Sequence, residues 1–557
     1  MTFNPDNPLI LQSDRTILLE VHNPLFEEVR DSISPFAELI KSPEHIHTYA
    51  ITSLSLWNAA SAGFSTDHIR NCLETYTKYE VPQNIIEDIK DILSRYGKIC
   101  LVPSEKKEFF RLEVNDPYLL EEVKHNKKIK PVLVEEIRGK GFFIHMKDRG
   151  NIKQILIKTG YPVKDMAGYT DGTELKIQLK NITSSGKNFH LRDYQKGSVN
   201  SFYRSNSPEG GHGVIVLPCG AGKTVTGMAI MEKISSYTLI ISTSTVAVHQ
   251  WISELLDKTD ITPDLIGEYT GNIKEIKPVT LTTYQILTHR KSKEEDFIHL
   301  GLFQKQNWGL IIYDEVHTLP APVFRATAEI QSKRRLGLTA TLVREDGLEE
   351  DVFSLVGPKK YDIPWKELES KGYIAQAYCH EIRVELSNEE KFEYALADER
   401  NKFRIASENA KKLEIAEEIM KKHSGDQILI IGQYISQLEY FRDRLNLPLI
   451  TGKMKNRERE KLYEEFRRGD IHHLIVSKVA NFAVDLPDAN VAIQISGTFG
   501  SRQEEAQRLG RILRPKDKSS FFYTLVSRDT KEQDFALNRQ MFLAEQGYKY
   551  IIEYYQP

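Results

Sequence analysis

The residues best suited to chemistry lie at positions 212–224, which read His-Gly-Val-Ile-Val-Leu-Pro-Cys-Gly-Ala-Gly-Lys-Thr. The apolar run 214–217 predicts a buried strand, and a glycine-rich turn then leads into a predicted helix that Lys223 opens. Backbone N–H groups of such a turn can surround an anion, and the helix N-terminus adds positive partial charge. The stretch therefore predicts a phosphate-binding loop formed by Pro218, Cys219, Gly220, Ala221 and Gly222.

Two side chains that follow this loop fit its expected chemistry. Lys223 can reach the β- and γ-phosphates of ATP, and the Thr224 hydroxyl can bind Mg²⁺. The strict pattern of such loops has glycine at position 217, where this chain has Leu217. The mechanism depends on Gly222, Lys223 and Thr224, which are all present, so we expect ATP and Mg²⁺ as ligands.

A second apolar strand, residues 310–313, ends in the adjacent carboxylates Asp314 and Glu315. Asp314 can hold Mg²⁺ while Glu315 polarises the attacking water. An exposed acidic strand end and a chance Gly-Lys-Thr are both common alone. Together, in one series of predicted strands and helices, the two patterns predict nucleotide hydrolysis. The next strand ends in the hydroxyl-bearing triplet 339–341 (Thr-Ala-Thr), which can relay changes at the nucleotide.

A third group of polar residues lies at 503–514, Gln-Glu-Glu-Ala-Gln-Arg-Leu-Gly-Arg-Ile-Leu-Arg. On a helix, Gln507, Arg511 and Arg514 lie at i, i+4 and i+7, so all three project from one face. Arginines that a second domain supplies to a phosphate loop are typical of an arginine finger. The alternative is an ordinary basic helix face in solvent.

The elements that must position these residues form two series of alternating strands and helices. This alternation predicts parallel sheets with helices on both faces. The fold class is therefore α/β, with two tandem parallel-sheet domains at 189–364 and 426–557 and a charged helical bridge at 365–425. The expected strands are 213–217, 238–242, 279–283, 309–313 and 335–338 in the first series, and 427–431, 448–450, 473–476, 491–495 and 521–526 in the second.

Residues 1–185 show no catalytic pattern. Residues 1–100 are predicted to be mostly helical, and three short amphipathic helices within 51–96 fit a winged-helix-like module. A helical scaffold without DNA contact fits them equally well. Residues 101–185 contain short β-like runs separated by Gly, Asn and Lys, which predict a small α+β domain.

The composition is that of an ordinary globular protein of about three or four domains, with 557 residues and a formal net charge of −3. This charge does not indicate nucleic-acid binding, so a basic groove would have to be local. No stretch approaches the roughly 18 apolar residues that span a bilayer, and we expect a cytoplasmic protein. Four cysteines without paired spacing predict free thiols and no zinc or iron–sulfur site; they are Cys72, Cys100, Cys219 and Cys379.

Taken together, these stretches resemble the superfamily 2 helicases and, within them, the XPB family in its prokaryotic form. The resemblance is dense from about residue 189 to 550, and the N-terminal stretch 42–49 also resembles prokaryotic XPB proteins. A triplet, Arg344-Glu345-Asp346, is a feature of this branch. The other matching stretches are 191–195, 214–223, 337–343, 477–479, 485–491, 493–496, 522–527, 539–540 and 545–548.

The resemblance implies two RecA-like domains and ATP-dependent 3′→5′ translocation on DNA, in a repair or transcription role. It implies that Gln195 reads the adenine and that Gln507, Arg511 and Arg514 face the γ-phosphate. Arg344, Glu345 and Asp346 would sit at the duplex junction. A thumb-like insert should fall within 365–410, where it is short, and 101–185 would resemble a DNA- or damage-recognition domain.

DNA, both single strands and duplex junctions, is the expected partner of a chain that we expect to be a monomer. A nuclease or repair protein is a further expected partner. Contacts from strand ends to phosphates would be sequence-tolerant and salt-sensitive. The candidates, each of which is equally compatible with ordinary surface, are Thr243, Thr283, Ser477 and Lys478.

Other functions share part of this pattern. A double-strand translocase without strand separation needs the same motor, so the sequence leaves it open. An RNA helicase fits the XPB-like details less well, and an iron–sulfur helicase lacks the cysteines. A catalytically dead DNA-binding scaffold is disfavoured by the intact Lys223, Thr224, Asp314 and Glu315. A nuclease fusion lacks a further acidic cluster.

Overall fold

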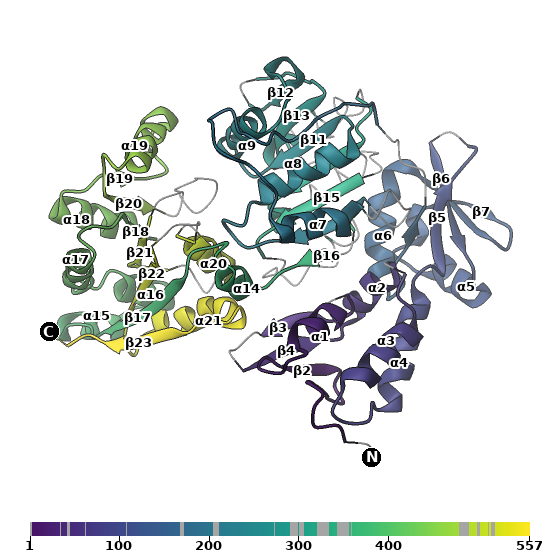
Figure 1. The fold of residues 1–557 in the computed structure, drawn as a ribbon, viewed down its shortest axis with the longest axis horizontal. Helices are drawn as coiled ribbons and strands as arrows, with labels where there is room; N and C mark the ends of the chain where they lie inside the picture. The colour runs from purple at the N-terminus through teal and green to yellow at the C-terminus, as the bar shows by residue number, and fades with distance from the viewer. Residues whose placement is uncertain are drawn as a thin grey trace. The chain divides into compact units, whose positions relative to one another are not determined.

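The chain forms two compact units, which we describe separately (Figure 1). The first comprises Met1–Ile40, Glu44–Leu217 and Gly222–Asp362, and the second comprises Ile363–Pro557 with the short segments Lys41–Pro43 and Pro218–Ala221. The computed structural model describes the chain except for residues 1–2, 34, 42–44, 62, 107, 167–171, 204–210, 272, 290–298, 300–305, 320–333, 342–351, 353–355, 358, 478–488, 498–501, 511, 514–517 and 557.

The N-terminal part of the first unit combines four helices with a four-stranded sheet. The helices are α1 (Phe26–Ile33), α2 (Ser53–Ser61), α3 (Thr66–Tyr76) and α4 (Gln83–Arg95), so the three helices expected within 51–96 are confirmed. Ser65 caps α3, because its side chain accepts the His68 N–H. The sequence did not predict the strands, which run in the order β1 (Leu9–Leu11), β2 (Thr16–Glu20), β4 (Ile46–Ala50) and β3 (Glu38–Lys41). Trp57 is buried in the shared core.

A second, small sheet follows, with the order β7 (Leu133–Ile137), β8 (Gly141–His145), β6 (Phe109–Val114), β5 (Ile99–Pro103) and β9 (Lys164–Asp165). The helices α5 (Pro117–His125) and α6 (Arg149–Lys158) contribute to its apolar core. Side chains alternate between buried and half-exposed along β6, as expected for a sheet with one covered face. The small α+β domain expected after residue 100 thus has its strands here.

The first motor sheet has seven parallel strands in the order β12 (Ile266–Tyr269), β13 (Val279–Thr283), β11 (Thr238–Ser242), β14 (Leu310–Asp314), β15 (Arg334–Thr339), β10 (His212–Val216) and β16 (Lys359–Asp362). All five strands expected in the first series are present, and β12 and β16 were not expected. Its helices are α7 (Asp193–Tyr203), α8 (Lys223–Ile234), α9 (Thr245–Lys258) and the short α10 (Tyr284–Leu287), with the 3₁₀ turns η4 (Pro263–Leu265) and η5 (Val316–Thr318).

The second motor sheet also has seven parallel strands, in the order β19 (Leu449–Ile450), β20 (His473–Ser477), β18 (Ile428–Gly432), β21 (Val491–Gln494), β22 (Ser520–Ser527), β17 (Ala377–Val384) and β23 (Tyr550–Tyr554). The second expected series is confirmed. The bridge at 365–425 is not wholly helical, because it contributes β17 to this sheet. The helices are α14 (Trp365–Ser370), α15 (Asn388–Leu396), α16 (Glu399–Ser407), α17 (Lys412–Lys422), α18 (Ile435–Leu445), α19 (Asn456–Arg468), α20 (Arg502–Gly510) and α21 (Lys531–Glu545).

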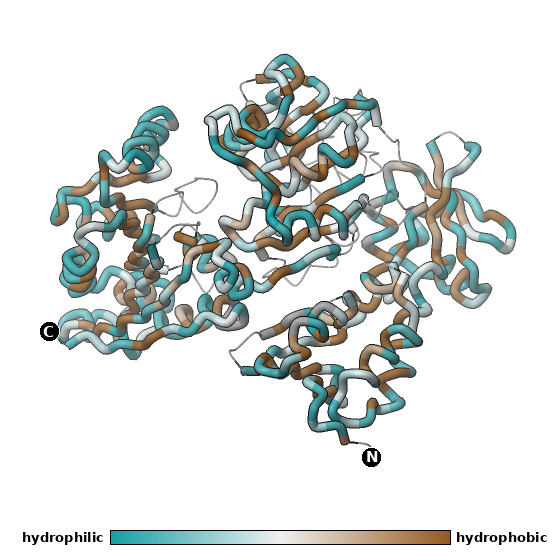
Figure 2. Tube along the Cα trace, viewed as in Figure 1, coloured by the Kyte–Doolittle hydropathy of each residue, from teal (hydrophilic) through white to brown (hydrophobic). Residues whose placement is uncertain are grey.

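Hydropathy follows these layers. The inner strands of both motor sheets are largely hydrophobic, while a solvent-facing helix such as α19 is mostly hydrophilic (Figure 2). Fully buried parallel strands require this pattern, because helices cover both faces. Among the described residues, none of the helices is both long enough and apolar enough to span a bilayer.

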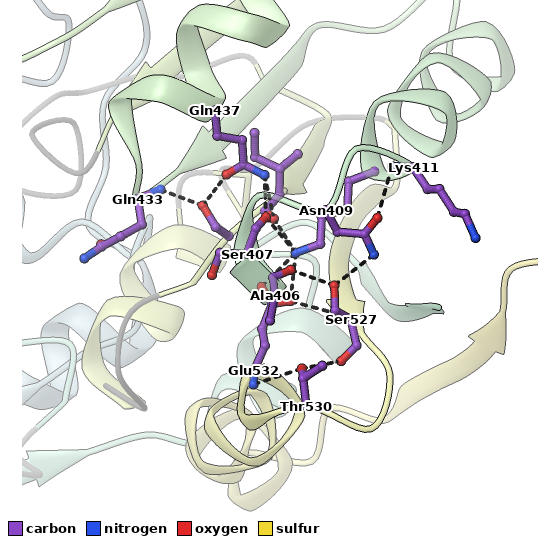
Figure 3. A network of polar contacts seen from close by, with 12 residues as sticks. Ala406, Ser407, Asn409, Lys411, Gln433, Gln437, Ser527, Thr530 and Glu532 are labelled. Carbon is purple, nitrogen blue, oxygen red and sulfur yellow. Dashed lines mark hydrogen bonds and ion pairs between the residues drawn. The ribbon is translucent and has the colours of Figure 1, made fainter. Parts of the chain in front are cut away.

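A buried polar network fastens the helices of the second unit to its sheet (Figure 3). Lys412 and Glu532 both have fully buried side chains, and Lys412 Nζ lies 2.8 Å from each carboxylate oxygen. Lys412 also donates to the carbonyl oxygens of Ser407 and Ile495, at 3.1 and 2.9 Å. The Ser527 N–H donates to Glu532 Oε2 at 2.8 Å. The network therefore joins α16, α17, α21 and the ends of β21 and β22.

Candidate functional site

The candidate site is assembled at one edge of the first motor sheet. Strands β10, β14, β15 and β11 are parallel neighbours, so their carboxyl ends meet there. In open parallel sheets this is the edge where ligands bind. The phosphate loop follows β10, and the acid pair and the Thr-Ala-Thr triplet lie at the carboxyl ends of β14 and β15, as the sequence predicted.

The loop after β10 has the backbone that a phosphate loop needs. Gly220 and Gly222 have φ angles of +79° and +81°, a left-handed conformation that favours glycine. Gly222 is the N-cap of α8, which begins at Lys223, and Thr224 is half-buried in its first turn. The Leu217 N–H donates to Thr339 O at 3.0 Å, which ties the start of the loop to the end of β15.

Gln195 lies directly against this loop. It is buried on α7, with 4% of the residue exposed, and its Oε1 accepts the Arg192 N–H at 2.9 Å. A Cβ atom at Gly222 would lie only 2.6 Å from Gln195 Nε2. Gly222 is therefore required both by its φ angle and by the close approach of the Gln195 amide.

The acid pair faces the lysine of the loop. Glu315 Oε1 lies 3.5 Å from Lys223 Nζ, and Glu315 has a left-handed backbone with φ of +50°. Asp314 Oδ2 accepts hydrogen bonds from Ser242 Oγ at 3.1 Å and from Trp251 Nε1 at 3.0 Å. Desolvation and the neighbouring Glu315 carboxylate raise the pKa of Asp314 to about 6.

A hydrogen-bonded chain continues from the acid pair to β15. The buried His317 Nδ1 lies 2.6 Å from Thr339 Oγ1, and the Thr341 N–H donates to the same oxygen at 3.1 Å. Because Thr339 also accepts the Leu217 N–H, one residue contacts both the acid-pair segment and the phosphate loop. This geometry fits the relay role expected for the triplet 339–341.

The donor set fits Mg²⁺. Two adjacent carboxylates with one nearby lysine leave a local excess of negative charge. Mg²⁺ is commonly bound through one or two carboxylates together with phosphate oxygens. Asp314 and the Thr224 hydroxyl are the residues that would hold it. Elsewhere in the described parts of the chain, no cluster of three or more His, Cys, Asp or Glu residues suits a metal.

The predicted finger residues belong to the second unit. Gln507 is half-buried on α20, but this helix ends at Gly510. Ile512 and Leu513 are not helical, so the expectation that Gln507, Arg511 and Arg514 share one continuous helix face is wrong. Arg511 and Arg514 lie outside the described residues, as do Arg344, Glu345, Asp346 and Lys478.

The remaining candidate DNA contacts differ in exposure. Thr243 is half-buried directly after β11. Thr283 is 5% exposed and caps α10, while Ser477 is 2% exposed at the end of β20. The hydroxyls of Thr283 and Ser477 are therefore enclosed in this structure.

Sequence reasoning missed several residues that contact the site. Ser242 and Trp251 hold Asp314, and His317 reaches the triplet; of these, only His317 had a signal, its place two residues after Glu315. On α20 it missed Arg508, which is 1% exposed and donates to Gln494 Oε1. Arg508 follows Gln507 directly and is rotated about 100° from it around the helix, which places its side chain in the core of the second unit.

Comparison with known proteins covers nearly the whole chain. The model of the ERCC3/RAD25/XPB C-terminal helicase matches residues 368–555, that of the type III restriction enzyme res subunit matches 188–344, and a helicase conserved C-terminal domain model matches 9–138. The DNA 3′–5′ helicase XPB of Kineococcus radiotolerans is 50% identical over 98% of this chain and 96% of its own length. That of Mycobacterium tuberculosis is 50% identical over 98% of both chains.

Among solved structures, the ATP-dependent type ISP restriction-modification enzyme LlaBIII bound to DNA superposes with a TM-score of 0.52 at 14% identity. The superposition covers 66% of this chain and 32% of that one, and it supports the fold alone.

Two parallel motor sheets, with a phosphate loop and an acid pair at the carboxyl edge of the first, define an ATP-hydrolysing helicase of superfamily 2. The two relatives that are 50% identical over nearly their full length also identify the family within this superfamily. The chain belongs to the XPB family of DNA 3′–5′ helicases.

Proposed function

We propose that the chain hydrolyses ATP at the edge of its first motor sheet and uses the energy to separate DNA strands while it moves 3′→5′. The observation that carries this proposal is the 3.5 Å approach of Lys223 Nζ to Glu315 Oε1 beside Asp314. Lys223, Asp314 and Glu315 are the three groups that a phosphate-transfer site needs. Lys223 is the cation for the phosphates, Asp314 is the metal ligand and Glu315 is the residue that orients water.

Each residue has a distinct role in this proposal. Lys223 and the loop N–H groups bind the β- and γ-phosphates. When nucleotide binds, Lys223 Nζ would leave the Glu315 carboxylate and contact a phosphate oxygen instead. Glu315 then accepts a proton from the attacking water. Asp314 and Thr224 hold Mg²⁺, which when bound neutralises phosphate charge and orients the leaving group. Gln195 binds the adenine.

The contact between His317 and Thr339 supports a relay between the nucleotide and β15. Loss of the γ-phosphate changes what Glu315 faces, and His317 lies two residues away on the same turn. Because Thr339 O also accepts the N–H of Leu217 at the start of the phosphate loop, a shift of the segment that carries Glu315 and His317 can reach this loop through Thr339.

The family resemblance supports further roles. Gln507, Arg511 and Arg514 would bind the γ-phosphate, and Arg344, Glu345 and Asp346 would act at the duplex junction. Thr243, Thr283, Ser477 and Lys478 stay predictions as DNA contacts. A monomeric state, a cytoplasmic location, and a nuclease or repair partner are also predictions.

The test measures ATP hydrolysis and strand displacement in the same reactions, with single-stranded, blunt duplex, 5′-tailed and 3′-tailed DNA. We expect DNA to stimulate hydrolysis and only the 3′-tailed duplex to be unwound. Lys223→Ala is expected to lose both activities, because the phosphates lose their cation. Stimulation by duplex DNA without any strand separation would contradict the proposal and identify a double-strand translocase.

A further inference from the structure

The carboxylate of Asp314 is held from two directions by elements that carry no recognised motif. Ser242 is the last residue of β11, the strand next to β14, and its hydroxyl lies 3.1 Å from Asp314 Oδ2. Trp251 lies in the middle of α9, and its indole Nε1 lies 3.0 Å from the same oxygen. Ser242 is fully buried and Trp251 is 2% exposed.

Two donors on one oxygen determine how the carboxylate is oriented. A carboxylate oxygen has two lone pairs in its plane, and the indole N–H and the hydroxyl use both on Oδ2. Rotation about the side chain would break both hydrogen bonds in a desolvated place, where an unpaired polar group is costly. Oδ1 is therefore the oxygen that remains for a cation, and its direction is fixed.

The indole itself is locked by close packing. A Cβ atom at Gly227 would lie 2.6 Å from Trp251 Cη2, so only glycine at this position leaves room for the ring. Gly227 lies on α8, the helix that the phosphate loop opens. Trp251 thus bridges the helix of Lys223 and the strand of Asp314, and it cannot shift without moving one of them.

We propose that Trp251 is a positioning residue for the metal ligand Asp314: with Ser242, it fixes the carboxylate so that one oxygen faces the Mg²⁺ that accompanies ATP. This inference rests on the proposed function in one respect, the assignment of Asp314 as the metal ligand. Outer hydrogen-bond partners of metal ligands generally contribute in this way, and their loss weakens metal binding about 10- to 100-fold.

The experiment measures metal binding directly, with Mn²⁺ as a paramagnetic probe in place of Mg²⁺. Free Mn²⁺ is followed by electron paramagnetic resonance as it is titrated into the full-length protein saturated with ADP. ADP binding without metal is measured separately by calorimetry. Trp251→Phe keeps a smaller aromatic side chain and removes the N–H, whereas Ser242→Ala removes the other donor with little change in volume.

We expect each variant to bind Mn²⁺ about tenfold more weakly in the presence of ADP. The affinity for ADP without metal should stay the same, because the phosphate loop is untouched. Trp308→Phe is the matched control: Trp308 is also 2% exposed and packs in the apolar core of the same sheet, so this variant should bind Mn²⁺ as the wild type does.

Wild-type Mn²⁺ affinity in both Trp251→Phe and Ser242→Ala would overturn the inference. A parallel loss of metal-free ADP binding would also overturn it, because the two residues would then only shape the loop. If Trp251→Phe does not fold, Ser242→Ala alone decides. Asp314→Asn separates the two proposals: unchanged Mn²⁺ binding in this variant would refute Asp314 as the metal ligand, whatever Trp251 does.

Discussion

At the scale of residues, Gly222 and Gly186 have nearly the same positive φ angle and differ in what surrounds them. Their φ angles are +81° and +82°. A Cβ atom at Gly222 would lie 2.6 Å from Gln195 Nε2, whereas one at Gly186 would have no atom within 4 Å. Alanine at each site therefore carries the same backbone strain, about 1 kcal/mol, and only one of them displaces a neighbour.

We predict that Gly222→Ala weakens ADP binding at least about tenfold, because a shift of this loop by an ångström misplaces the N–H groups that bind phosphate. Gly186→Ala should keep wild-type affinity with a similar loss of thermal stability. Calorimetric titration with ADP compares them. Equal affinities would show that the Gln195 amide moves aside without effect on the loop.

Glu315 gives a second prediction at this scale. Glu315→Gln keeps the shape of the side chain and the left-handed turn but removes the proton acceptor. We expect ATP binding within about twofold of wild type and hydrolysis slower by roughly 10²- to 10⁴-fold, as for the loss of a general base. Filter binding and phosphate release measure the two. Near-normal turnover would mean that another group activates the water.

The sequence predicts some of these residues and not others, for physical reasons. Lys223, Asp314 and Glu315 could be located because each follows a strand with a strong apolar pattern. Trp251 and Ser242 could not, because their role depends on the neighbouring position of β11 and β14, which local sequence does not encode. The left-handed backbone of Glu315 also has no local signal, since glutamate rarely adopts it.

At the scale of elements, the buried pair Lys412–Glu532 connects helices that are distant in sequence. A buried ion that loses its partner is strongly destabilising, because the remaining charge is neither hydrated nor paired. Lys412→Met would leave the buried Glu532 carboxylate without its cationic partner. Replacement of both by apolar residues of similar volume avoids that penalty.

We predict that Lys412→Met lowers the free energy of unfolding of the second unit by about 3–5 kcal/mol, and that Lys412→Met with Glu532→Leu recovers part of it. Recovery is partial because the Ser527 N–H and the carbonyls of Ser407 and Ile495 lose these partners. Urea unfolding followed by circular dichroism measures both. The control is Lys391→Met: its pair with Glu385 at 3.3 Å has both side chains about half exposed, and its loss should cost less than about 1 kcal/mol. A double variant no more stable than Lys412→Met would contradict the argument.

Strand β17 shows why one element was assigned wrongly from sequence. Its residues, Ala-Tyr-Cys-His-Glu-Ile-Arg-Val, contain charges that favour an exposed helical bridge. In the structure Glu381 is 2% exposed, because Arg383 and Gln540 both donate to its carboxylate. The partner Gln540 is 159 positions away, so no local pattern could show that this charge can be buried. Tertiary pairing here overrides the local preference.

At the scale of the whole molecule, the described residues include separate apolar cores in the N-terminal helices, in the small sheet and in each of the two motor sheets. Separate cores predict unfolding in several steps rather than one. A ligand stabilises only the part that binds it, by RT ln(1 + [L]/Kd). The nucleotide site assembled here belongs to the first motor sheet.

We predict that Mg²⁺ and ADP at about one hundred times their dissociation constant stabilise the first motor core by about 2.7 kcal/mol. The transition of the N-terminal helices should stay in place. Differential scanning calorimetry with and without nucleotide resolves the transitions, and Lys223→Ala should abolish the shift. A uniform shift of every transition would show that the cores unfold together.

The four tryptophans of the chain lie in three parts of the molecule, and each is at least 96% buried. Trp57 lies among the N-terminal helices, Trp251 and Trp308 in the first motor domain, and Trp365 at the start of α14 in the second unit. Indole emission shifts to longer wavelength when water reaches the ring, so each of these three regions carries an intrinsic optical reporter. The small sheet at 99–165 has no tryptophan, so its unfolding would not change the tryptophan fluorescence. Variants with one remaining tryptophan would therefore report each region in turn without any attached dye.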